Sequence, residues 1–375
     1  MKKMTFNRWA LFTVFGLILP FIFPAEQAKA CTGITLKTQN GDTIYGRTME
    51  WGTFDLRSRI VFYPRGYRYK SEMPKGMTGI SWIGRHGVAG LDALDRGCMF
   101  DGMNEKGLSA GLFYHPGFST YPEWSKEIAE RALGPVDVLT YALSTCENVE
   151  EVKKALTYAI VVSIDEEAIG FPAPIHAIFT QADGKQIIVE WIGKKVQFYD
   201  SKVGVITNAP EYPWHLTNLR NYVNRMSGNP AAPINLGAFK VSPLGGGSGM
   251  LGLPGDFTPP SRFIRAAAFS ATVRPLPNAV EGLYELFRIL DNFNVPLGAG
   301  EGDGNKATQG LHSATAWTIA HDHTNRLFLY HTQNDRQLQM VDLKRIDFGA
   351  FNKIIALPID TGKQSVKDRT PVLAE

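Results

Sequence analysis

Cys31 is the residue whose type and position in this sequence most clearly suggest a chemical reaction. It follows Ala28–Ala30 (Ala-Lys-Ala), a small-x-small pattern typical of a signal-peptide cleavage site. A basic start and an apolar run over 9–24 precede that pattern. Cleavage there would leave Cys31 as the first residue, with a thiol and a free α-amine together. We therefore expect residues 1–30 to be a signal peptide, and the protein to be exported from a bacterium, into the periplasm or the medium.

A thiol and an α-amine on one residue form a self-contained acyl-transfer centre. A model thiol has a pKa of about 8.5 and an α-amine one of about 7.7–8.0, so a neutral amine can accept the thiol proton near working pH. The thiolate would attack a carbonyl carbon, and the ammonium would return its proton to the leaving amine. Because the amine is free only after cleavage, we expect the precursor to be inactive.

A lipoprotein is the alternative for a cysteine behind a signal peptide. Cys31 would then anchor a non-catalytic lipidated or secreted binding protein. Lipidation signals have Leu or a similar residue three positions before the cysteine and a small residue two before. Here those positions hold Ala28 and Lys29, and the lysine argues against lipidation.

Composition excludes several classes of partner. The chain has 39 Lys and Arg against 36 Asp and Glu, and four of those basic residues and one acid lie in residues 1–30. The remainder is formally neutral, which does not favour nucleic acid or an anionic membrane. No later apolar run approaches the roughly 20 residues of a membrane span. Cys98 and Cys146 would either pair or remain buried thiols.

The residues after Cys31 alternate as strands do. Gly33–Lys37 and Thr43–Met49 flank Asn40-Gly41-Asp42, which predicts a hairpin. This pattern, with the later helices and strands, predicts an α+β architecture with mainly antiparallel sheets. The length after residue 30 is compatible with one large domain or two smaller ones, and because no linker is convincing we expect a single domain over 31–375. Further strands are expected at Arg59–Tyr63, Gly107–Tyr114, Ile175–Gln181, Ile187–Ile192, Gly204–Asn208, Ala314–His321, Arg326–His331 and Gln337–Asp342, and helices at Pro135–Leu143, Val149–Tyr158, Arg262–Thr272 and Ala279–Phe293.

Arg47 and Glu50 lie on the second strand of that hairpin, which can bring them beside Cys31. A guanidinium near the thiol would favour the thiolate, and a carboxylate could orient the α-ammonium. Without further information, exposed strand charges would explain both residues at least as well.

An ordered set of motifs resembles the choloylglycine hydrolase and penicillin V acylase family of N-terminal nucleophile hydrolases. The resemblance covers nearly all of the chain after residue 30 and implies a four-layer αββα sandwich. The matching segments are Cys31–Gly33 (CTG), Gly46–Trp51 (GRTMEW), Asn104–Leu108 (NEKGL), Thr207–Pro210 (TNAP), Leu216–Tyr222 (LTNLRNY), Gly252–Asp256 (GLPGD) and Ser261–Phe263 (SRF).

The resemblance also implies roles for individual residues. Cys31 would be both nucleophile and base, with Arg47 and Arg262 supporting the charge of its thiolate. Asn208 would donate its side-chain amide to the oxyanion, a bond typically worth about 10²–10³ in rate. Glu50 stands where the family usually has Asp, beside the α-amine. A second oxyanion donor is expected from a backbone N–H near Phe113 or Tyr114.

The implied activity is hydrolysis of a small-molecule amide that joins an apolar acyl group to a small polar amine. The family's substrates are conjugated bile salts, penicillin V and, in some members, N-acyl homoserine lactones. Phe113, Tyr114, His115 and Trp82 are candidate pocket walls, although core packing explains each about as well. Family members are often tetrameric, so a homo-oligomer is expected.

No cofactor or metal is expected. His321-Asp322-His323 could suggest a metal, but no third ligand is placed and the context is that of a strand end. Gly245–Gly249 lacks the Lys-Ser/Thr ending of a phosphate-binding loop.

Overall fold

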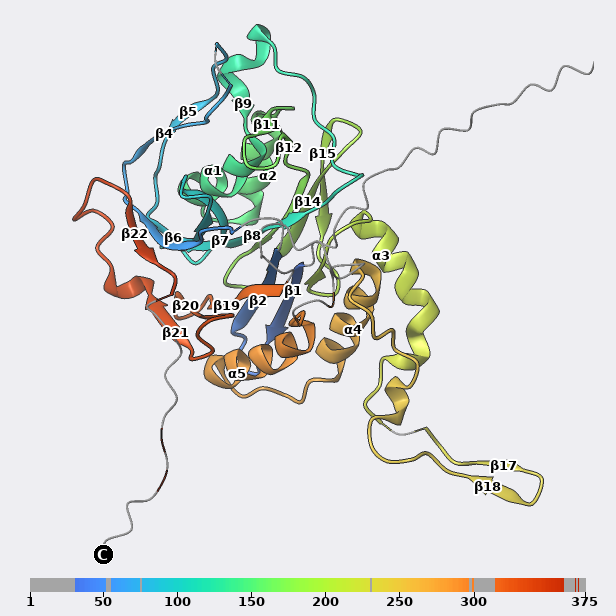
Figure 1. The fold of residues 1–375 in the computed structure, drawn as a ribbon. Coiled ribbons are helices and arrows are strands. Elements are labelled where there is room, and N and C mark those ends of the chain that lie inside the picture. Colours follow the sequence, from blue (N-terminus) through green and yellow to red (C-terminus); the bar gives the residue numbers. More distant parts are fainter. Residues whose placement is uncertain are drawn as a thin grey trace, which may run out of the picture.

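The computed structural model describes residues 31–51, 55–74, 76–229, 231–296, 299, 314–360, 368 and 370. The expected signal peptide, 1–30, lies outside them. Two β-sheets are stacked in the middle of the molecule, with helices on both outer faces (Figure 1). The predicted four-layer αββα sandwich is therefore what the chain forms.

The first sheet carries Cys31 and has six antiparallel strands in the order β16-β1-β2-β19-β20-β21. The predicted hairpin is its first unit, with Cys31 opposite Met49 and Gly33 opposite Arg47. Gly41 adopts φ +85° in the turn, a conformation that glycine reaches without steric cost. The strands are β1 (Cys31–Lys37), β2 (Thr43–Trp51), β16 (Val205–Ile206), β19 (Ala314–Asp322), β20 (Leu327–Thr332) and β21 (Gln339–Asp342).

The second sheet has eight antiparallel strands in the order β15-β14-β13-β8-β7-β6-β3-β22. β6 and β7 were not predicted from the sequence, because their segments, VAGLDA and CMFDGMN, mix glycine and aspartate with apolar residues. The strands are β3 (Arg59–Tyr63), β6 (Val88–Ala93), β7 (Cys98–Asn104), β8 (Ser109–Tyr114), β13 (Ile175–Thr180), β14 (Gln186–Ile192), β15 (Lys195–Asp200) and β22 (Ile355–Pro358).

Four helices make the outer layers. α1 (Val138–Thr145) and α2 (Val149–Tyr158) pack on the eight-stranded sheet, and α4 (Pro259–Thr272) and α5 (Ala279–Leu290) pack on the six-stranded sheet. Asn148 and Asn278 cap α2 and α5 by accepting from Glu151 N and Glu281 N, as side-chain oxygens do at helix starts. None of the helices in the described part of the chain has the length and hydropathy of a membrane span.

The remaining elements lie at the edges and ends of the sheets. One of them, α3 (Tyr212–Leu219), follows β16 and was not predicted. The others are the short pairs β4 (Arg68–Lys70) with β5 (Ser81–Ile83), β9 (Ala132–Leu133) with β10 (Ile160–Val161), β11 (Asp165–Glu166) with β12 (Phe171–Pro172), and β17 (Ile234–Leu236) with β18 (Phe239–Val241).

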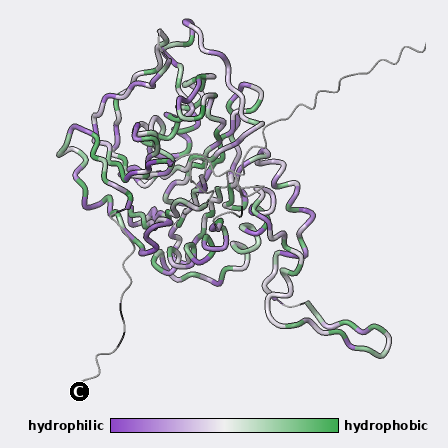
Figure 2. The backbone as a smooth tube through the Cα atoms, viewed as in Figure 1, coloured by the Kyte–Doolittle hydropathy of each residue, from purple (hydrophilic) through white to green (hydrophobic). Residues whose placement is uncertain are grey.

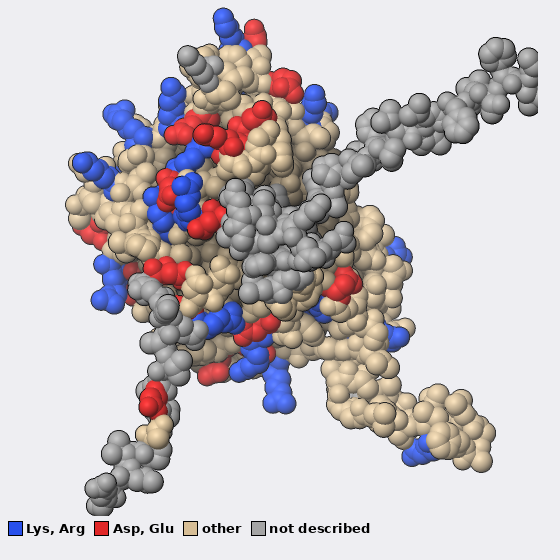
Figure 3. All heavy atoms as spheres, in the orientation of Figure 1, with Lys and Arg blue, Asp and Glu red and all other residues tan. Residues whose placement is uncertain are grey.

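The hairpin β17–β18 projects from the body of the molecule (Figure 1). We call residues 231–246 the arm. Ile234, Leu236 and Phe239 on it are 57%, 62% and 70% exposed. Hydrophobic residues recur along both of its strands (Figure 2), and Lys240 is its one charged residue (Figure 3). The arm is therefore an exposed apolar surface.

Cys98 and Cys146 are buried free thiols. Burial raises the pKa of Cys146 to about 11 and raises that of Cys98 further. Of the two alternatives for this pair, the structure supports unpaired cysteines.

Candidate active site

The predicted catalytic side chains come from four separate segments and meet at the start of β1. All are almost completely buried, at 0–2% exposure. β1 and β2 bring three of them together through their register, the loop between β16 and α3 brings the fourth, and α4 brings the fifth. These residues are Cys31, Arg47, Glu50, Asn208 and Arg262.

Cys31 is held by its backbone. Its N–H donates to Asn208 Oδ1 over 2.9 Å, and its carbonyl accepts from Arg262 Nη1. Its Sγ lies 3.7 Å from Met49 Sδ. In this chain the nitrogen is the peptide nitrogen that follows Ala30, so it has one hydrogen to donate.

Asn208 uses both ends of its side-chain amide. Oδ1 also accepts from Arg262 Nη2 over 2.7 Å, and Nδ2 donates to the carbonyl of Tyr114 over 2.7 Å. An amide nitrogen carries two hydrogens. Asn208 Nδ2 therefore has a second hydrogen besides the one bonded to Tyr114, and its oxyanion role stays a prediction.

Arg262 on α4 links β1 to the loop of Asn208 and to the segment before its own helix. Besides Cys31 and Asn208, it donates from Nη1 to Thr32 Oγ1 over 2.9 Å and from Nε to the Phe257 carbonyl over 2.8 Å. Burial lowers the pKa of Arg262 to about 10, although the nearby carboxylate of Glu50 acts to raise that pKa. Arg262 thus remains cationic at neutral pH.

Arg47 lies on the other side of Met49. Its Nη2 contacts Met49 Sδ at 3.2 Å, and its Nη1 donates to the carbonyls of Phe100 and Leu112. Its guanidinium carbon lies 4.1 Å from the centre of the Phe113 ring, in cation–π geometry. These contacts fix the guanidinium next to Met49, whose Sδ in turn lies beside Cys31 Sγ.

Glu50 is a buried carboxyl with one hydrogen-bond partner from β19. Its Oε1 accepts from Thr315 Oγ1 over 2.8 Å, and Oε2 has no hydrogen bond within the described residues. Burial raises its pKa to about 7, and Arg262 and Arg47 oppose that rise. The predicted bond from Glu50 to a free α-ammonium stays a prediction, because the nitrogen of Cys31 is here a peptide nitrogen.

The electrostatic balance at the thiol differs from the expectation. Burial raises the pKa of Cys31 above its ordinary value, although Arg47 and Arg262 both lower it. The guanidiniums act in the predicted direction, but desolvation of the thiolate is the larger effect. In this buried state the thiol form of Cys31 is favoured.

Cys31 lines a small apolar cavity of about 40 Å³. Phe113 and Tyr114 are among its walls, as predicted, and Met49 and Trp51 join them. The other lining residues are Leu56, Leu94, Phe100, Leu112, Val136, Glu166, Ile169, Ala173 and Ile175.

Trp82 and His115 are not among those walls, contrary to the interpretation of the sequence. The Trp82 ring stacks on Tyr69 with centres 5.0 Å apart and donates to Ser144 Oγ, within the core between the eight-stranded sheet and its helices. His115 follows the end of β8, and its ring stacks on His176. Both rings therefore pack in the interior rather than against the cavity.

Comparison with known proteins places this site in a family. The model of the linear amide C–N hydrolases, choloylglycine hydrolase family, matches residues 31–356. A bile salt hydrolase/transferase from Clostridium perfringens is 32% identical over 321 residues, which cover 84% of this chain and 93% of the relative. The chain belongs to the choloylglycine hydrolase family.

Other relatives and solved structures agree. A penicillin V acylase from Pectobacterium atrosepticum is 25% identical over 340 residues, covering 85% of this chain and 82% of the relative. A variant of conjugated bile acid hydrolase from Clostridium perfringens superposes with a TM-score of 0.78 at 27% identity, covering 91% of this chain and all of the other. Penicillin V acylase from Agrobacterium tumefaciens, at 22% identity, shares the fold with a TM-score of 0.71, over 89% of this chain and 94% of the other. The chain is a linear amide hydrolase with the N-terminal nucleophile hydrolase fold.

His115, His176 and Glu190 form a cluster whose residue types could bind a metal ion. Their candidate ligand atoms all lie within 4.8 Å of one another, and all three residues are buried. The two imidazole rings are stacked, however, with centres 4.2 Å apart and planes 5° apart. A metal lies in the plane of each imidazole that binds it, and one ion cannot lie in two separated parallel planes. The arrangement does not suit a single ion.

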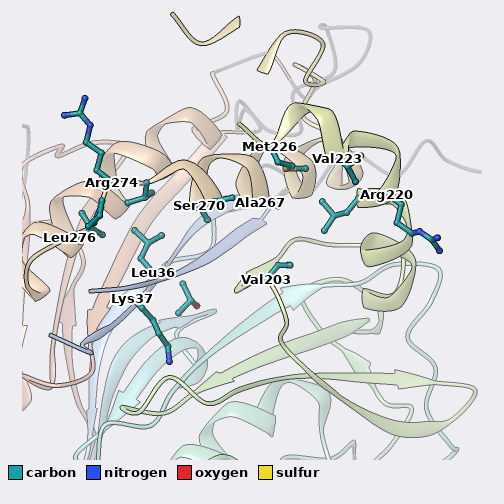
Figure 4. A pocket seen from close by; sticks show the side chains of 15 residues that line it. Leu36, Lys37, Val203, Arg220, Val223, Met226, Ala267, Ser270, Arg274 and Leu276 are labelled. Atoms are coloured by element: carbon teal, nitrogen blue, oxygen red, sulfur yellow. The ribbon is translucent and has the colours of Figure 1, made fainter. Parts of the chain in front are cut away.

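A larger groove of about 610 Å³ lies elsewhere (Figure 4). It is lined from β1 by Thr35–Lys37, at the opposite end of that strand from Cys31, and none of the predicted catalytic residues lines it. Arg220 and Arg274 point away from it (Figure 4). This groove is therefore distinct from the candidate active site.

The sequence did not identify the residues that hold the predicted catalytic groups in place through hydrogen bonds. Thr32 accepts from Arg262, and Thr315 donates to Glu50. His176 and His215 bond the backbone carbonyls of Thr207 and Asn208. The threonines follow the alternation of their strands and gave no separate signal. The histidines are isolated in the sequence, so only the folded chain brings them together.

Proposed function

We propose that this chain is an exported N-terminal-cysteine amidohydrolase. It cleaves the amide between an apolar acyl group and a small polar amine through an acyl-enzyme on Cys31. The observation that carries the proposal is the convergence on Cys31 of one side-chain amide, Asn208, and two guanidiniums, Arg47 and Arg262, beside an apolar cavity.

Acylation begins with proton transfer inside Cys31. After removal of 1–30, the neutral α-amine accepts the thiol proton, and the thiolate attacks the carbonyl carbon of the amide. The free hydrogen of Asn208 Nδ2 donates to the oxyanion of the tetrahedral intermediate. As the intermediate collapses, the α-ammonium gives its proton to the leaving amine and the thioester remains.

Deacylation uses the same groups in reverse. The α-amine accepts a proton from a water molecule, the water oxygen attacks the thioester, and Asn208 again donates to the oxyanion. The thiolate leaves, takes back a proton from the ammonium, and the carboxylic acid is released. We assign Glu50 the hydrogen bond from the ammonium in both half-reactions.

Maturation would change the electrostatics of the thiol. In the uncleaved chain, burial holds the pKa of Cys31 above its ordinary value. Cleavage adds an α-ammonium beside the thiol, and a nearby positive charge favours the thiolate. The buried thiol of the uncleaved chain thus supports the expectation of an inactive precursor.

The apolar side chains around Cys31 favour an apolar group next to the scissile carbonyl. Relatives are named bile salt hydrolase/transferase, conjugated bile acid hydrolase and penicillin V acylase. We infer a substrate of this kind: a conjugated bile salt, penicillin V or an N-acyl homoserine lactone. The pattern at 28–30 supports export, which would place the reaction in the periplasm or the medium.

The arm supports a homo-oligomer, for which we propose a tetramer from the family resemblance. Its exposed Ile234, Leu236 and Phe239 form an apolar, nearly uncharged surface of the kind that subunit contacts bury. Light scattering of the wild type against Leu236→Asp tests this, because a charge on the arm should shift the molecule towards the monomer. An unchanged mass would contradict it.

Mass spectrometry of the purified protein tests the central proposal. The mature chain should begin with an unmodified Cys31, and acid quenching during turnover of glycocholate, penicillin V or a long-chain acyl homoserine lactone should trap an acyl adduct on that residue. A mature chain that begins elsewhere, or a blocked Cys31 in an active protein, would reject the mechanism. A diacylglyceryl adduct would indicate an anchor instead.

A further inference from the structure

The loop that carries Asn208 rests on buried ionisable side chains. Residues 207–211 connect β16 to α3 and lie over the face of the eight-stranded sheet where His176 and Glu190 are direct cross-strand partners. His176, Glu190 and Asn208 are 2%, 0% and 1% exposed. None of the predicted catalytic groups accounts for burying a histidine and a carboxyl here.

Three hydrogen bonds tie these side chains to the loop backbone. His176 Nε2 lies 3.0 Å from the carbonyl of Thr207, immediately before Asn208. His215 Nε2 lies 3.0 Å from the carbonyl of Asn208 itself. Glu190 Oε1 accepts from the N–H of Tyr212 over 2.9 Å. Tyr212 is the first residue of α3, where amides lack helical partners.

The chemistry of these bonds fixes the protons. A carbonyl can only accept, so Nε2 of each histidine carries its hydrogen. Burial lowers the pKa of His176 to about 3 and that of His215 to about 4, so both rings are neutral at working pH. Nδ1 of His176 is then a lone pair, and it lies 3.3 Å from Glu190 Oε1.

His176 Nδ1 and an ionised Glu190 oxygen would both be acceptors, so a hydrogen bond between them requires a proton on Glu190. Burial raises the pKa of Glu190, which favours its protonated form as the donor. The result is a closed ring of bonds from the Thr207 carbonyl through His176 and Glu190 to Tyr212 N–H. The ring brackets Asn208 on both sides along the chain.

We propose that His176 is a positioning residue for acyl transfer, which with Glu190 fixes the backbone of residues 207–212 so that the Asn208 amide meets the oxyanion. The inference rests on the proposed function, because it assigns His176 a task that acts through Asn208. His176 does not line the Cys31 cavity. Its ring contacts Phe113, a cavity wall, edge-on, with ring centres 6.0 Å apart.

Three substitutions of His176 separate positioning from packing. His176→Leu keeps an apolar volume but removes the donor, and His176→Asn keeps polarity but is too short to reach the Thr207 carbonyl. Both should lower kcat by about 10–100-fold, a fraction of the value of an oxyanion donor, with KM within about 3-fold. His176→Gln places an N–H near the position of Nε2 and should recover kcat to within about 5-fold of wild type.

His323→Leu is the matched control. His323 is 1% exposed, its pKa is lowered by burial to about 3, and it bonds a backbone carbonyl, that of Thr43, over 2.9 Å. Its other hydrogen-bond partner among the described residues is Ser109 Oγ at 2.7 Å, so it does not bond the loop that carries Asn208. His323→Leu should lower thermal stability as much as His176→Leu does, while kcat of the folded protein stays unchanged.

A double-mutant cycle completes the test. If His176 acts through Asn208, then adding His176→Leu to Asn208→Ala should lower kcat no further. Wild-type kcat in His176→Leu and His176→Asn, equal losses in His323→Leu, or additive losses in the double mutant would each overturn the inference while leaving the proposed function intact. Wild-type kcat in Asn208→Ala alone would instead reject the oxyanion role of Asn208, and the inference with it.

Discussion

The thiols of Cys31 and Cys98 are buried to the same degree but lie in opposite electrostatic surroundings. They are 2% and 4% exposed, and burial raises the pKa of both. The next largest influence on Cys31 is the Arg47 guanidinium, which lowers its pKa, whereas on Cys98 it is Asp137, which raises it. Because the thiolate is the reactive form, this difference in neighbouring charge agrees with the proposed role of Cys31 as nucleophile and with that of Cys98 as a core residue.

The strongest test of this comparison removes each thiol in turn. Cys31→Ala should abolish amide hydrolysis, with a loss on the order of 10⁴-fold or more, because no other group can carry the acyl intermediate. Steady-state kinetics on the panel of three substrates measures the loss, and circular dichroism checks that the fold is retained. Cys98→Ala is the control and should retain kcat. Equal activity in the two variants would end the distinction between them.

Removing a guanidinium beside Cys31 should have the next largest effect. Arg262→Met deletes the bonds to the Cys31 carbonyl and to Asn208 and leaves Glu50 with less counter-charge. We expect kcat/KM to fall by about 10²–10³-fold, and the unfolding free energy by about 3–5 kcal/mol.

Arg265→Met is the control on the same helix. Arg265 is also buried, but it donates to the carbonyls of Pro254 and Asp256, away from the thiol. Denaturant unfolding and kinetics of the two variants side by side should show a loss of stability in both and a loss of rate in Arg262→Met alone. A comparable rate loss in Arg265→Met would mean that α4 matters for packing rather than charge.

Local parts of this site can be predicted from the sequence, and distant parts cannot. The alternation of residues 31–51 and the turn at Asn40–Asp42 suffice to place Arg47 beside the Cys31 strand. Asn208 and Arg262 are 177 and 231 residues from Cys31 along the chain. No periodicity joins positions so far apart, and only the resemblance to a family identified them.

The helices also divide into one that local sequence predicts and one that it does not. α2 was predicted with its observed bounds, Val149–Tyr158, because Glu150 and Glu151 mark its first turn and its apolar residues recur at helical spacing. α3, which ends the loop of Asn208, has a proline in its first turn but no acidic residue there. Its start is set by Glu190 of a distant strand, which accepts from Tyr212 N–H. A tertiary contact thus replaces the local signal.

Glu50 offers a smaller effect that sharpens the contrast between buried groups. Burial raises its pKa to about 7, above the ordinary value of 4.5, so the folded state holds its proton more tightly than the unfolded state. Its contribution to stability is therefore fully present below pH 4.5 and is lost as the pH rises through 7. The expected loss is about 3 kcal/mol, since one pKa unit is worth about 1.4 kcal/mol.

Glu50→Gln should remove that loss. The difference in unfolding free energy between wild type and Glu50→Gln should grow in favour of the variant from pH 5 to pH 8, as measured by urea unfolding at each pH. Histidines such as His176 and His323 have lowered pKa values and act in the opposite direction below pH 6.5, but they are common to both proteins and cancel in the difference. A difference that does not change with pH would show that Glu50 is ionised throughout.

The smallest expected effect concerns the two sides of the eight-stranded sheet. Phe113 faces the core between the sheets and lines the Cys31 cavity, whereas Trp82 packs in the core between the eight-stranded sheet and its helices. The sequence predicted a strand at Phe113 but none at Trp82, and a three-residue strand such as β5 is too short to reveal which core its middle residue enters. Phe113→Leu should raise KM several-fold, because it reshapes the cavity wall. Trp82→Leu should lower the melting temperature, because it removes a stacked ring, and should leave KM within about 2-fold of wild type. If Trp82→Leu raised KM as much as Phe113→Leu did, substrate would have to reach through the sheet, and the assignment of the cavity to one side of it would be wrong.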